Sequence, residues 1–156
     1  MILGINYANK KFIKAQKLNS WSMIHNGLVD KVIEYNPDML DKEFCDNNKE
    51  ILSYKRGGGY WIWKPYILCK SIENISDGDY LFYCDSGAVV IDSVMKLINS
   101  MENARQEVMS FELRAPEKNW SKRDAFIVLD CDYPQYIESP QRLSGYIIIK
   151  KSNIGV

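Results

Sequence analysis

The feature that most constrains the fold is the run Tyr-Leu-Phe-Tyr-Cys at residues 80–84. These five apolar and aromatic residues follow the turn sequence Ser-Asp-Gly-Asp at residues 76–79, and they predict a short strand buried on both faces. A strand of this kind is typical of a parallel sheet with helices on both sides. The run therefore favours an α/β fold over an all-helical or an all-strand one.

The rest of the chain alternates strand-like and helix-like segments. We expect strands over residues 1–8, 28–35, 80–84, 106–113 and 145–151, helices over 9–27, 36–44, 66–74, 93–101 and 121–129, and a loop over 51–59. The second helix has an Asn36 cap followed by proline. The last has Ser121 and Asp124 in capping-box spacing. This order predicts a single α/β domain over residues 1–156, with a mostly parallel sheet flanked by helices.

Composition excludes several classes of protein. Twenty basic and twenty acidic residues give a net charge of zero, which argues against a general nucleic-acid binder. The four cysteines are widely spaced and His25 is the only histidine, so neither a zinc site nor a disulfide scaffold is expected. The first residues lack the pattern of a signal peptide and no apolar run reaches the length of a membrane span, so we expect neither. We expect a cytoplasmic protein.

Asp85, Ser86 and Gly87 follow the buried strand directly. Ligands of open α/β sheets bind beyond the carboxyl ends of the strands, where a carboxylate can hold a divalent metal or a ribose hydroxyl. Gly87 would let a ligand approach the backbone closely. The alternative is an ordinary turn at the end of a strand, for which Asp, Ser and Gly are common residues.

A second candidate is the junction Gly57-Gly58-Gly59-Tyr60-Trp61-Ile62-Trp63-Lys64. Three glycines before a helix can bring backbone N–H groups close to a phosphate, and Lys55, Arg56 and Lys64 add positive charge. The junction is neither a Walker A loop nor a Gly-x-Gly-x-x-Gly motif. The aromatic residues could stack on a base or a sugar. The alternatives are a flexible loop and aromatic side chains divided between core and surface.

A third candidate is Asn-Trp-Ser-Lys-Arg-Asp at residues 119–124. Lys122 and Arg123 in a first helical turn oppose the helix dipole, and this unfavourable placement points to an anionic or sugar ligand. The alternative is a helix capped by Ser121 and Asp124, with both basic side chains solvated.

In this order these segments resemble a family of bacterial glycosyltransferase-like proteins. The resemblance rests on Ile-Asn-Tyr-Ala-Asn-Lys-Lys-Phe-Ile-Lys-Ala-Gln at 5–16, Arg-Gly-Gly-Gly-Tyr-Trp-Ile-Trp-Lys-Pro at 56–65, Asp-Gly-Asp-Tyr-Leu-Phe-Tyr-Cys-Asp-Ser-Gly at 77–87, Trp-Ser-Lys-Arg-Asp-Ala-Phe at 120–126, and Gln141 before an apolar strand. The family carries an Arg-Gly-x-Gly-Tyr-Trp-x-Trp-Lys-Pro signature, and many members are associated with surface polysaccharide synthesis.

The resemblance implies a GT-A-like, Rossmann-like transferase that uses a nucleotide-diphosphate sugar and a saccharide acceptor. It implies Mn²⁺ or Mg²⁺ on Asp85, although Gly87 stands where an Asp-x-Asp motif has its second carboxylate; Asp92 is a second nearby carboxylate. It implies donor-side residues, namely Gly58, Gly59, Tyr60, Trp63, Lys64, Ser86, Gly87, Lys122, Arg123 and Gln141, and it makes Asp85 and Asp124 the candidate catalytic residues.

Family members continue past the equivalent of Val156, so the resemblance also implies either a truncated chain or a short member that lacks part of the acceptor side. We therefore expect a glycosyltransferase, located in the cytoplasm or at the inner face of the membrane. The alternatives are a catalytically inactive GT-A-like binding or assembly module and an unrelated α/β nucleotide-binding enzyme.

Overall fold

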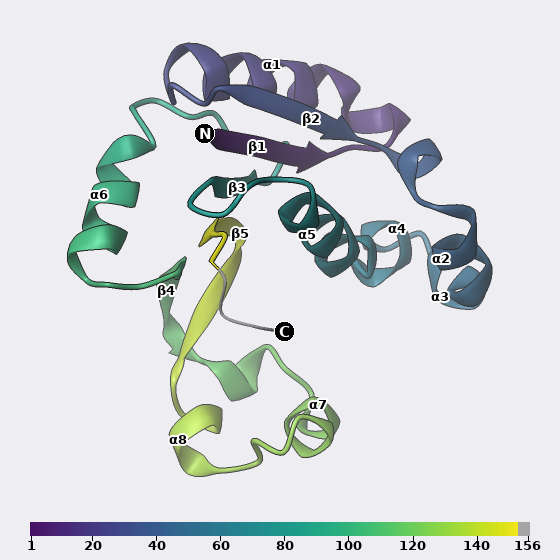
Figure 1. Cartoon of the computed structure of the whole chain (residues 1–156). Helices are drawn as coiled ribbons and strands as arrows, with labels where there is room; N and C mark the ends of the chain where they lie inside the picture. Colours follow the sequence, from purple (N-terminus) through teal and green to yellow (C-terminus); the bar gives the residue numbers. More distant parts are fainter. Residues whose placement is uncertain (153–156) are drawn as a thin grey trace. The chain divides into compact units, whose positions relative to one another are not determined.

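The computed structural model describes residues 1–152. The chain forms two compact units, of which the first comprises Met1–Met109 and the end of the chain from Ile147, and the second comprises Ser110–Tyr146. A five-stranded sheet has the order β2-β1-β3-β5-β4, and β4 and β5 run from the first unit into the second. Helices pack on this sheet (Figure 1).

The strands are β1 (Ile2–Tyr7), β2 (Lys31–Tyr35), β3 (Tyr80–Cys84), β4 (Val108–Pro116) and β5 (Pro140–Lys150). The longer helices are α1 (Ile13–His25), α5 (Trp63–Glu73) and α6 (Met95–Asn103). Shorter helical segments are η1 (Lys10–Phe12), η2 (Pro37–Met39), α2 (Lys42–Asn47), α3 (Lys49–Leu52), α4 (Gly57–Tyr60), η3 (Glu117–Asn119), α7 (Arg123–Val128) and α8 (Pro134–Ile137).

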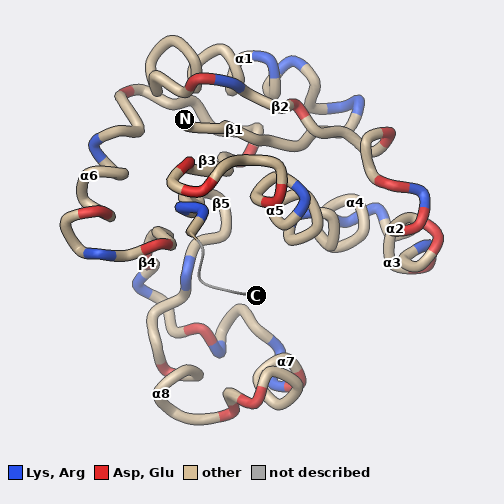
Figure 2. The backbone as a smooth tube through the Cα atoms, viewed as in Figure 1, with Lys and Arg blue, Asp and Glu red and all other residues tan. Residues whose placement is uncertain are grey.

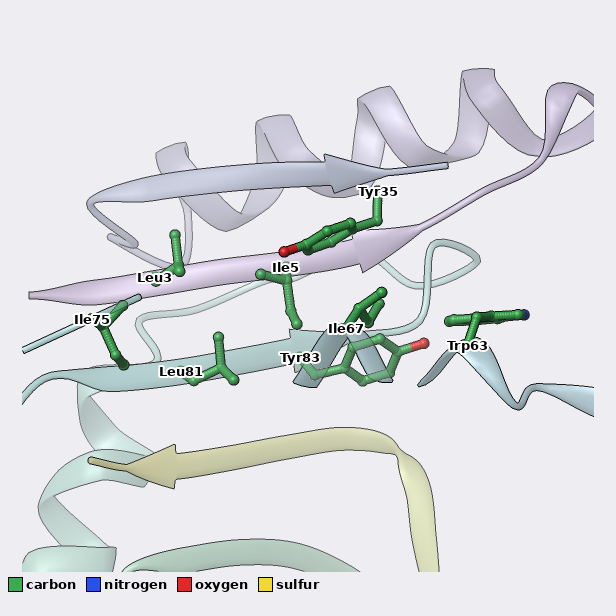
Figure 3. Packing of buried hydrophobic residues seen from close by; sticks show 8 residues of the cluster. All are labelled: Leu3, Ile5, Tyr35, Trp63, Ile67, Ile75, Leu81 and Tyr83. Carbon is green, nitrogen blue, oxygen red and sulfur yellow. The ribbon is translucent and has the colours of Figure 1, made fainter. Parts of the chain in front are cut away.

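Strand β1 pairs in parallel with β2 on one side and with β3, the central strand of the five, on the other. Gly4 lies opposite both Val32 and Phe82, which fixes the register of all three strands. The predicted parallel arrangement holds for these strands, and β3 covers residues 80–84 as predicted. The sheet as a whole is mixed, however, because the arrow of β5 points opposite to that of β3 (Figure 3).

One face of the sheet carries the main hydrophobic cluster. Side chains alternate along a strand, so Leu3 and Ile5 of β1 lie on this face with Leu81 of β3 (Figure 3). Ile67 of α5 packs against them and has 0% exposure, while Trp63 lies at the edge of the same cluster. This packing fixes the start of α5 beside the ends of the strands.

Helix α1 covers the opposite face, and it does so with polar side chains. Apolar residues at helical spacing ordinarily mark the buried face of a helix, yet Leu18 and Ile24 are exposed. The buried residues are instead Gln16, Asn19, Ser20, Ser22 and Met23. Gly4 allows this close contact, since a Cβ there would lie 2.8 Å from Met23 Sδ.

Three predicted segments differ from the structure. The expected helix over 36–44 is instead the 3-10 turn η2, followed after the extended residues Leu40 and Asp41 by α2. The expected loop over 51–59 contains the end of α3 and a left-handed turn. The expected capping box also does not form, because Lys122 is the N-cap of α7 without a side-chain cap, and the Ser121 hydroxyl donates to Glu117 Oε1 at 2.6 Å instead. Within residues 1–152, no helix is both long and apolar enough to cross a bilayer.

Candidate functional site

The strand order reverses around β1. The chain leaves β1 through α1 to reach β2, and it then returns through α2–α5 to β3 on the other side of β1. Because these strands are parallel, their carboxyl ends lie at one edge of the sheet, and the point between β1 and β3 is where such folds bind ligands. Tyr7 ends β1 and Cys84 ends β3. The Ser86 hydroxyl donates a hydrogen bond to the Tyr7 carbonyl, which holds the two strand ends together.

An ion pair lies at this edge. Lys64 Nζ is 3.0 Å from Asp85 Oδ1, and the side chain of Lys64 is 10% exposed whereas that of Asp85 is 50% exposed. The Tyr83 hydroxyl donates to the same carboxylate oxygen. Lys64 therefore lies beneath Asp85, with its ammonium 4.7 Å from the centroid of the Tyr83 ring. A buried ammonium needs such a partner to offset its lost hydration.

The start of α5 fixes Lys64 in this position. A cation in the first turn opposes the helix dipole, so packing and the Asp85 carboxylate must offset that cost. The Trp63 ring stacks on Tyr7 with centroids 3.7 Å apart, and Trp63 Nε1 donates to the Gly57 carbonyl at 2.9 Å. The tryptophan thus joins β1, the glycine turn and α5, which places the next residue against Asp85.

The glycine junction is a left-handed turn. Five successive residues have positive φ angles: 59° at Gly57, 57° at Gly58, 91° at Gly59, 51° at Tyr60 and 61° at Trp61. Glycine adopts this region freely, whereas Tyr60 and Trp61 do so at a steric cost. Both aromatic side chains are exposed. Gly59 is buried against Leu52, so its missing side chain is needed for packing.

Three polar residues of α1 hold the segment after β3. Asn19 Nδ2 donates to the Ala88 carbonyl at 2.9 Å and to the Asp85 carbonyl at 3.4 Å. The Ser22 hydroxyl accepts from Val90 N at 2.9 Å. Asn26 Nδ2 donates to the Val90 carbonyl at 2.8 Å. Because these residues lie three to seven positions apart on one helix, residues 85–90 are fixed along a single helical face.

Beneath this segment lies a buried amide network. Asn6 Nδ2 donates to Asn19 Oδ1 at 2.7 Å and to Ser20 Oγ at 2.9 Å. Gln16 Nε2 donates to Asn6 Oδ1 and to the Tyr35 carbonyl. These positioning residues were not predicted from the sequence. The available signal was Asn6, a polar residue inside an otherwise apolar strand.

A cavity of about 670 Å³ opens beyond the carboxyl ends of β1 and β2. This volume is within the usual range for small-molecule sites. Its polar lining consists of Asn9, Lys10, Lys11, Gln16, Lys17, Glu34, Asn36 and Asp38, a mixture of three cations, three amides and two carboxylates. None of the predicted site residues lines this cavity, although residues 5–16, which carry part of the family resemblance, supply much of its lining.

Burial changes the acidity of several groups near this edge. The pKa of the Tyr83 hydroxyl is raised, first by burial and then by the neighbouring Asp85 carboxylate. Burial also raises the pKa of the Tyr7 hydroxyl to about 12 and that of the Cys84 thiol to about 11. At neutral pH all three groups are protonated, so Tyr83 is a hydrogen-bond donor to Asp85.

The side chains at this edge do not form a metal site by themselves. Within residues 1–152, no group of three or more His, Cys, Asp or Glu side chains could hold a metal ion. Asp85 already accepts from Lys64 and Tyr83. Asp92, the second acidic candidate, pairs with Lys96. A cation at Asp85 would need most of its ligands from a bound molecule.

The remaining predicted residues lie in the second unit. Lys122, Arg123 and Asp124 are exposed at the start of α7. Arg123 makes a bidentate ion pair with Asp132 at 2.9–3.3 Å. Gln141 is at the start of β5, and its Oε1 is buried without a hydrogen-bond partner within residues 1–152.

The structure thus brings together Trp63, Lys64, Asp85 and Ser86 from the predicted set, with Gly87 exposed beside them. The glycine turn that contains Gly58, Gly59 and Tyr60 is connected to this group by the hydrogen bond from Trp63 to the Gly57 carbonyl. No protein-family model, curated protein or solved structure matches the chain.

Proposed function

We propose that the chain binds a nucleotide-diphosphate sugar at the carboxyl edge of β1, β2 and β3 and transfers the sugar to a saccharide hydroxyl. We also propose that the chain has a GT-A-like fold and is located in the cytoplasm. The observation that carries it is the reversal of strand order around β1. This reversal puts the cavity and the Lys64–Asp85 pair on the same edge of the sheet, where α/β proteins bind nucleotides.

The cavity suits the nucleoside part of such a donor. In dinucleotide-binding sheets, an acidic residue that follows the first strand–helix unit binds ribose hydroxyls, and Asp38 lies in a comparable position after β2. Asn9 and Asn36 supply amide groups that could bind a base. Lys10 and Lys11 supply positive charge for phosphate oxygens.

The Lys64–Asp85 pair suits the diphosphate end. In the transfer, the acceptor hydroxyl oxygen forms a bond to the anomeric carbon while the bond from that carbon to the β-phosphate oxygen breaks. The nucleoside diphosphate leaves with the electron pair, and the hydroxyl proton passes to a base or to water. Charge on the leaving group is the main electrostatic demand of this step. We propose that the Lys64 ammonium stabilises this negative charge.

The first test is calorimetric titration of the chain with UDP, GDP, CDP and their sugar conjugates. We expect one nucleotide class to bind. Asp38→Asn should weaken that binding by roughly tenfold or more, because a charge-assisted hydrogen bond to the ribose is lost. The matched control is Glu43→Gln, which makes the same charge change on the exposed surface of α2 and should bind normally.

Failure of every nucleotide to bind would overturn the proposed function. Binding that Asp38→Asn leaves unchanged would show that the nucleoside lies elsewhere.

A catalytically inactive binding module is the second candidate. It is favoured by Gly87 at the position of a second carboxylate and by the engagement of Asp85 with Lys64 and Tyr83. Chromatography of the reaction products separates the two candidates. An active enzyme releases the sugar from the bound donor or transfers it, whereas an inactive module leaves the donor intact. Binding without turnover would support the inactive module.

A further inference from the structure

The outer face of α1 is apolar although the helix lies on the protein surface. We define the outer face as the exposed residues Phe12, Ile13, Lys14, Lys17, Leu18, Trp21 and Ile24. The five apolar side chains among them are 44–52% exposed. The helix inverts the usual pattern, since its buried side is the amide-rich one. Clusters of large apolar side chains on a surface mark interaction sites.

Positive charge accompanies this apolar surface. Residues 10–28 contain Lys10, Lys11, Lys14 and Lys17 but no acidic residue, although the whole chain has a net charge of zero. These lysines occur at the N-terminal end of the helical segment, where α1 is coloured blue in Figure 2. One of the four, Lys17, pairs with Glu34 of β2. Three lysines beside exposed apolar side chains give the surface a positive character.

We propose that the outer face of α1 binds the anionic surface of a lipid bilayer. A helix with Trp, Leu, Ile and Phe beside several lysines is typical of segments that lie in a membrane interface. Trp21 stacks on His25 with centroids 4.5 Å apart and is 51% exposed, and tryptophan is enriched at the headgroup depth of membranes. The lysines attract anionic headgroups, each lysine adding severalfold to the affinity. This inference goes beyond the proposed function. Lys10 and Lys11 also line the cavity, whereas Lys14, Leu18 and Trp21 lie outside its lining, so substitutions at these three positions test membrane binding separately.

The test is co-sedimentation of the full chain with vesicles at low ionic strength. One set of vesicles contains equal parts of phosphatidylglycerol and phosphatidylcholine, and the other contains phosphatidylcholine alone. We expect binding to the anionic vesicles only, with a loss of binding on added salt. Leu18→Ser with Trp21→Ser should reduce the bound fraction roughly tenfold or more, because two apolar side chains no longer enter the interface.

Two controls separate membrane binding from general effects. Ile91→Ser removes a side chain of 88% exposure elsewhere in the same unit and should leave binding unchanged. Lys14→Glu should weaken binding roughly tenfold or more, whereas Lys49→Glu on α3 makes the same charge change away from α1 and should have a smaller effect.

Absence of binding to anionic vesicles would overturn the inference. So would a concentration-dependent dimer in sedimentation velocity that Leu18→Ser with Trp21→Ser abolishes, because the face would then contact a second copy of the chain. Unfolding of each variant in urea should match the wild type, since the substituted side chains are exposed.

Discussion

Asn19 on α1 donates a hydrogen bond of 2.9 Å to the carbonyl oxygen of Ala88, 69 residues further along the chain. The same amide lies 3.2 Å from Cys84 Sγ. One buried side chain thus joins a helix to the end of the central strand and to the segment that follows it. Asp85 lies between these two contacts, so the position of its carboxylate depends on Asn19.

Asn19→Ala should destabilise the fold by about 3 kcal/mol, because buried hydrogen-bonding groups of Asn6 and Ala88 lose their partner. Urea unfolding measures this change. Asn26→Ala is the comparison variant, since Asn26 makes one partly buried bond to Val90, and its loss should cost about 1 kcal/mol. Equal effects from the two variants would contradict a special role for Asn19.

The left-handed turn predicts a ranked series of glycine substitutions. Alanine at any of the three glycines should cost about 1 kcal/mol because of the positive φ. Gly58 has no further clash, since the nearest atom to a Cβ is 3.7 Å away. At Gly57 a Cβ would lie 2.5 Å from the exposed Trp61 ring, which can move. At Gly59 it would lie 2.8 Å from Leu52 Cα, which is backbone.

We therefore expect Gly59→Ala to be the most damaging, at about 3 kcal/mol or more, then Gly57→Ala, then Gly58→Ala. Thermal or urea unfolding of the three variants gives the order. A larger loss at Gly58 than at Gly59 would refute the turn geometry.

The buried thiol of Cys84 predicts a loss of stability at alkaline pH. Its pKa is about 11 in the folded chain against an ordinary value of 9.0. Below pH 9 the thiol is protonated in both states. Between pH 9 and 11 only the unfolded chain releases the proton, so the free energy of unfolding falls as the pH rises. The Cys84→Ala variant should lose less stability than the wild type between pH 8 and pH 10 in urea unfolding. Parallel losses in both proteins would contradict this account.

The parts of the fold predicted from sequence are those with a strong local pattern. The apolar run at 80–84 gave β3 with its correct bounds, because a strand buried on both faces needs no alternation. The helical pattern did not predict that the polar face of α1 is the buried one. Its buried face is determined by hydrogen bonds from Asn19 to residues distant in sequence, namely the Asn6 side chain and the Ala88 carbonyl. A hydrophobic pattern contains no information about such bonds.

The candidate site was predicted in the same uneven way. Asp85 and Lys64 were both singled out, yet their pairing depends on the packing of Trp63 against Tyr7, which no spacing in the sequence encodes. The cavity was not predicted. Residues 5–16 carry part of the family resemblance and supply much of its lining, but the cavity forms only where the ends of β1 and β2 come together, and no pattern in the sequence shows this. The Mn²⁺ or Mg²⁺ implied by the family resemblance stays a prediction.

The measurement that tests the account most directly compares binding of a nucleoside diphosphate in EDTA and in Mn²⁺. It uses calorimetry on the wild type, Lys64→Met, Asp85→Asn and the control Lys70→Met. Lys70 is on the same helix but pairs with Asp41 at the surface. If Lys64 neutralises the diphosphate, wild-type affinity should agree within about twofold in the two buffers, and Lys64→Met should lose about tenfold or more in EDTA.

In the same buffer Asp85→Asn should keep its affinity, because it removes a negative charge from beside the phosphates. Lys70→Met should behave as the wild type. Binding that requires Mn²⁺ and disappears in Asp85→Asn would contradict this account and would assign Asp85 to a metal ion, with nucleotide binding itself intact.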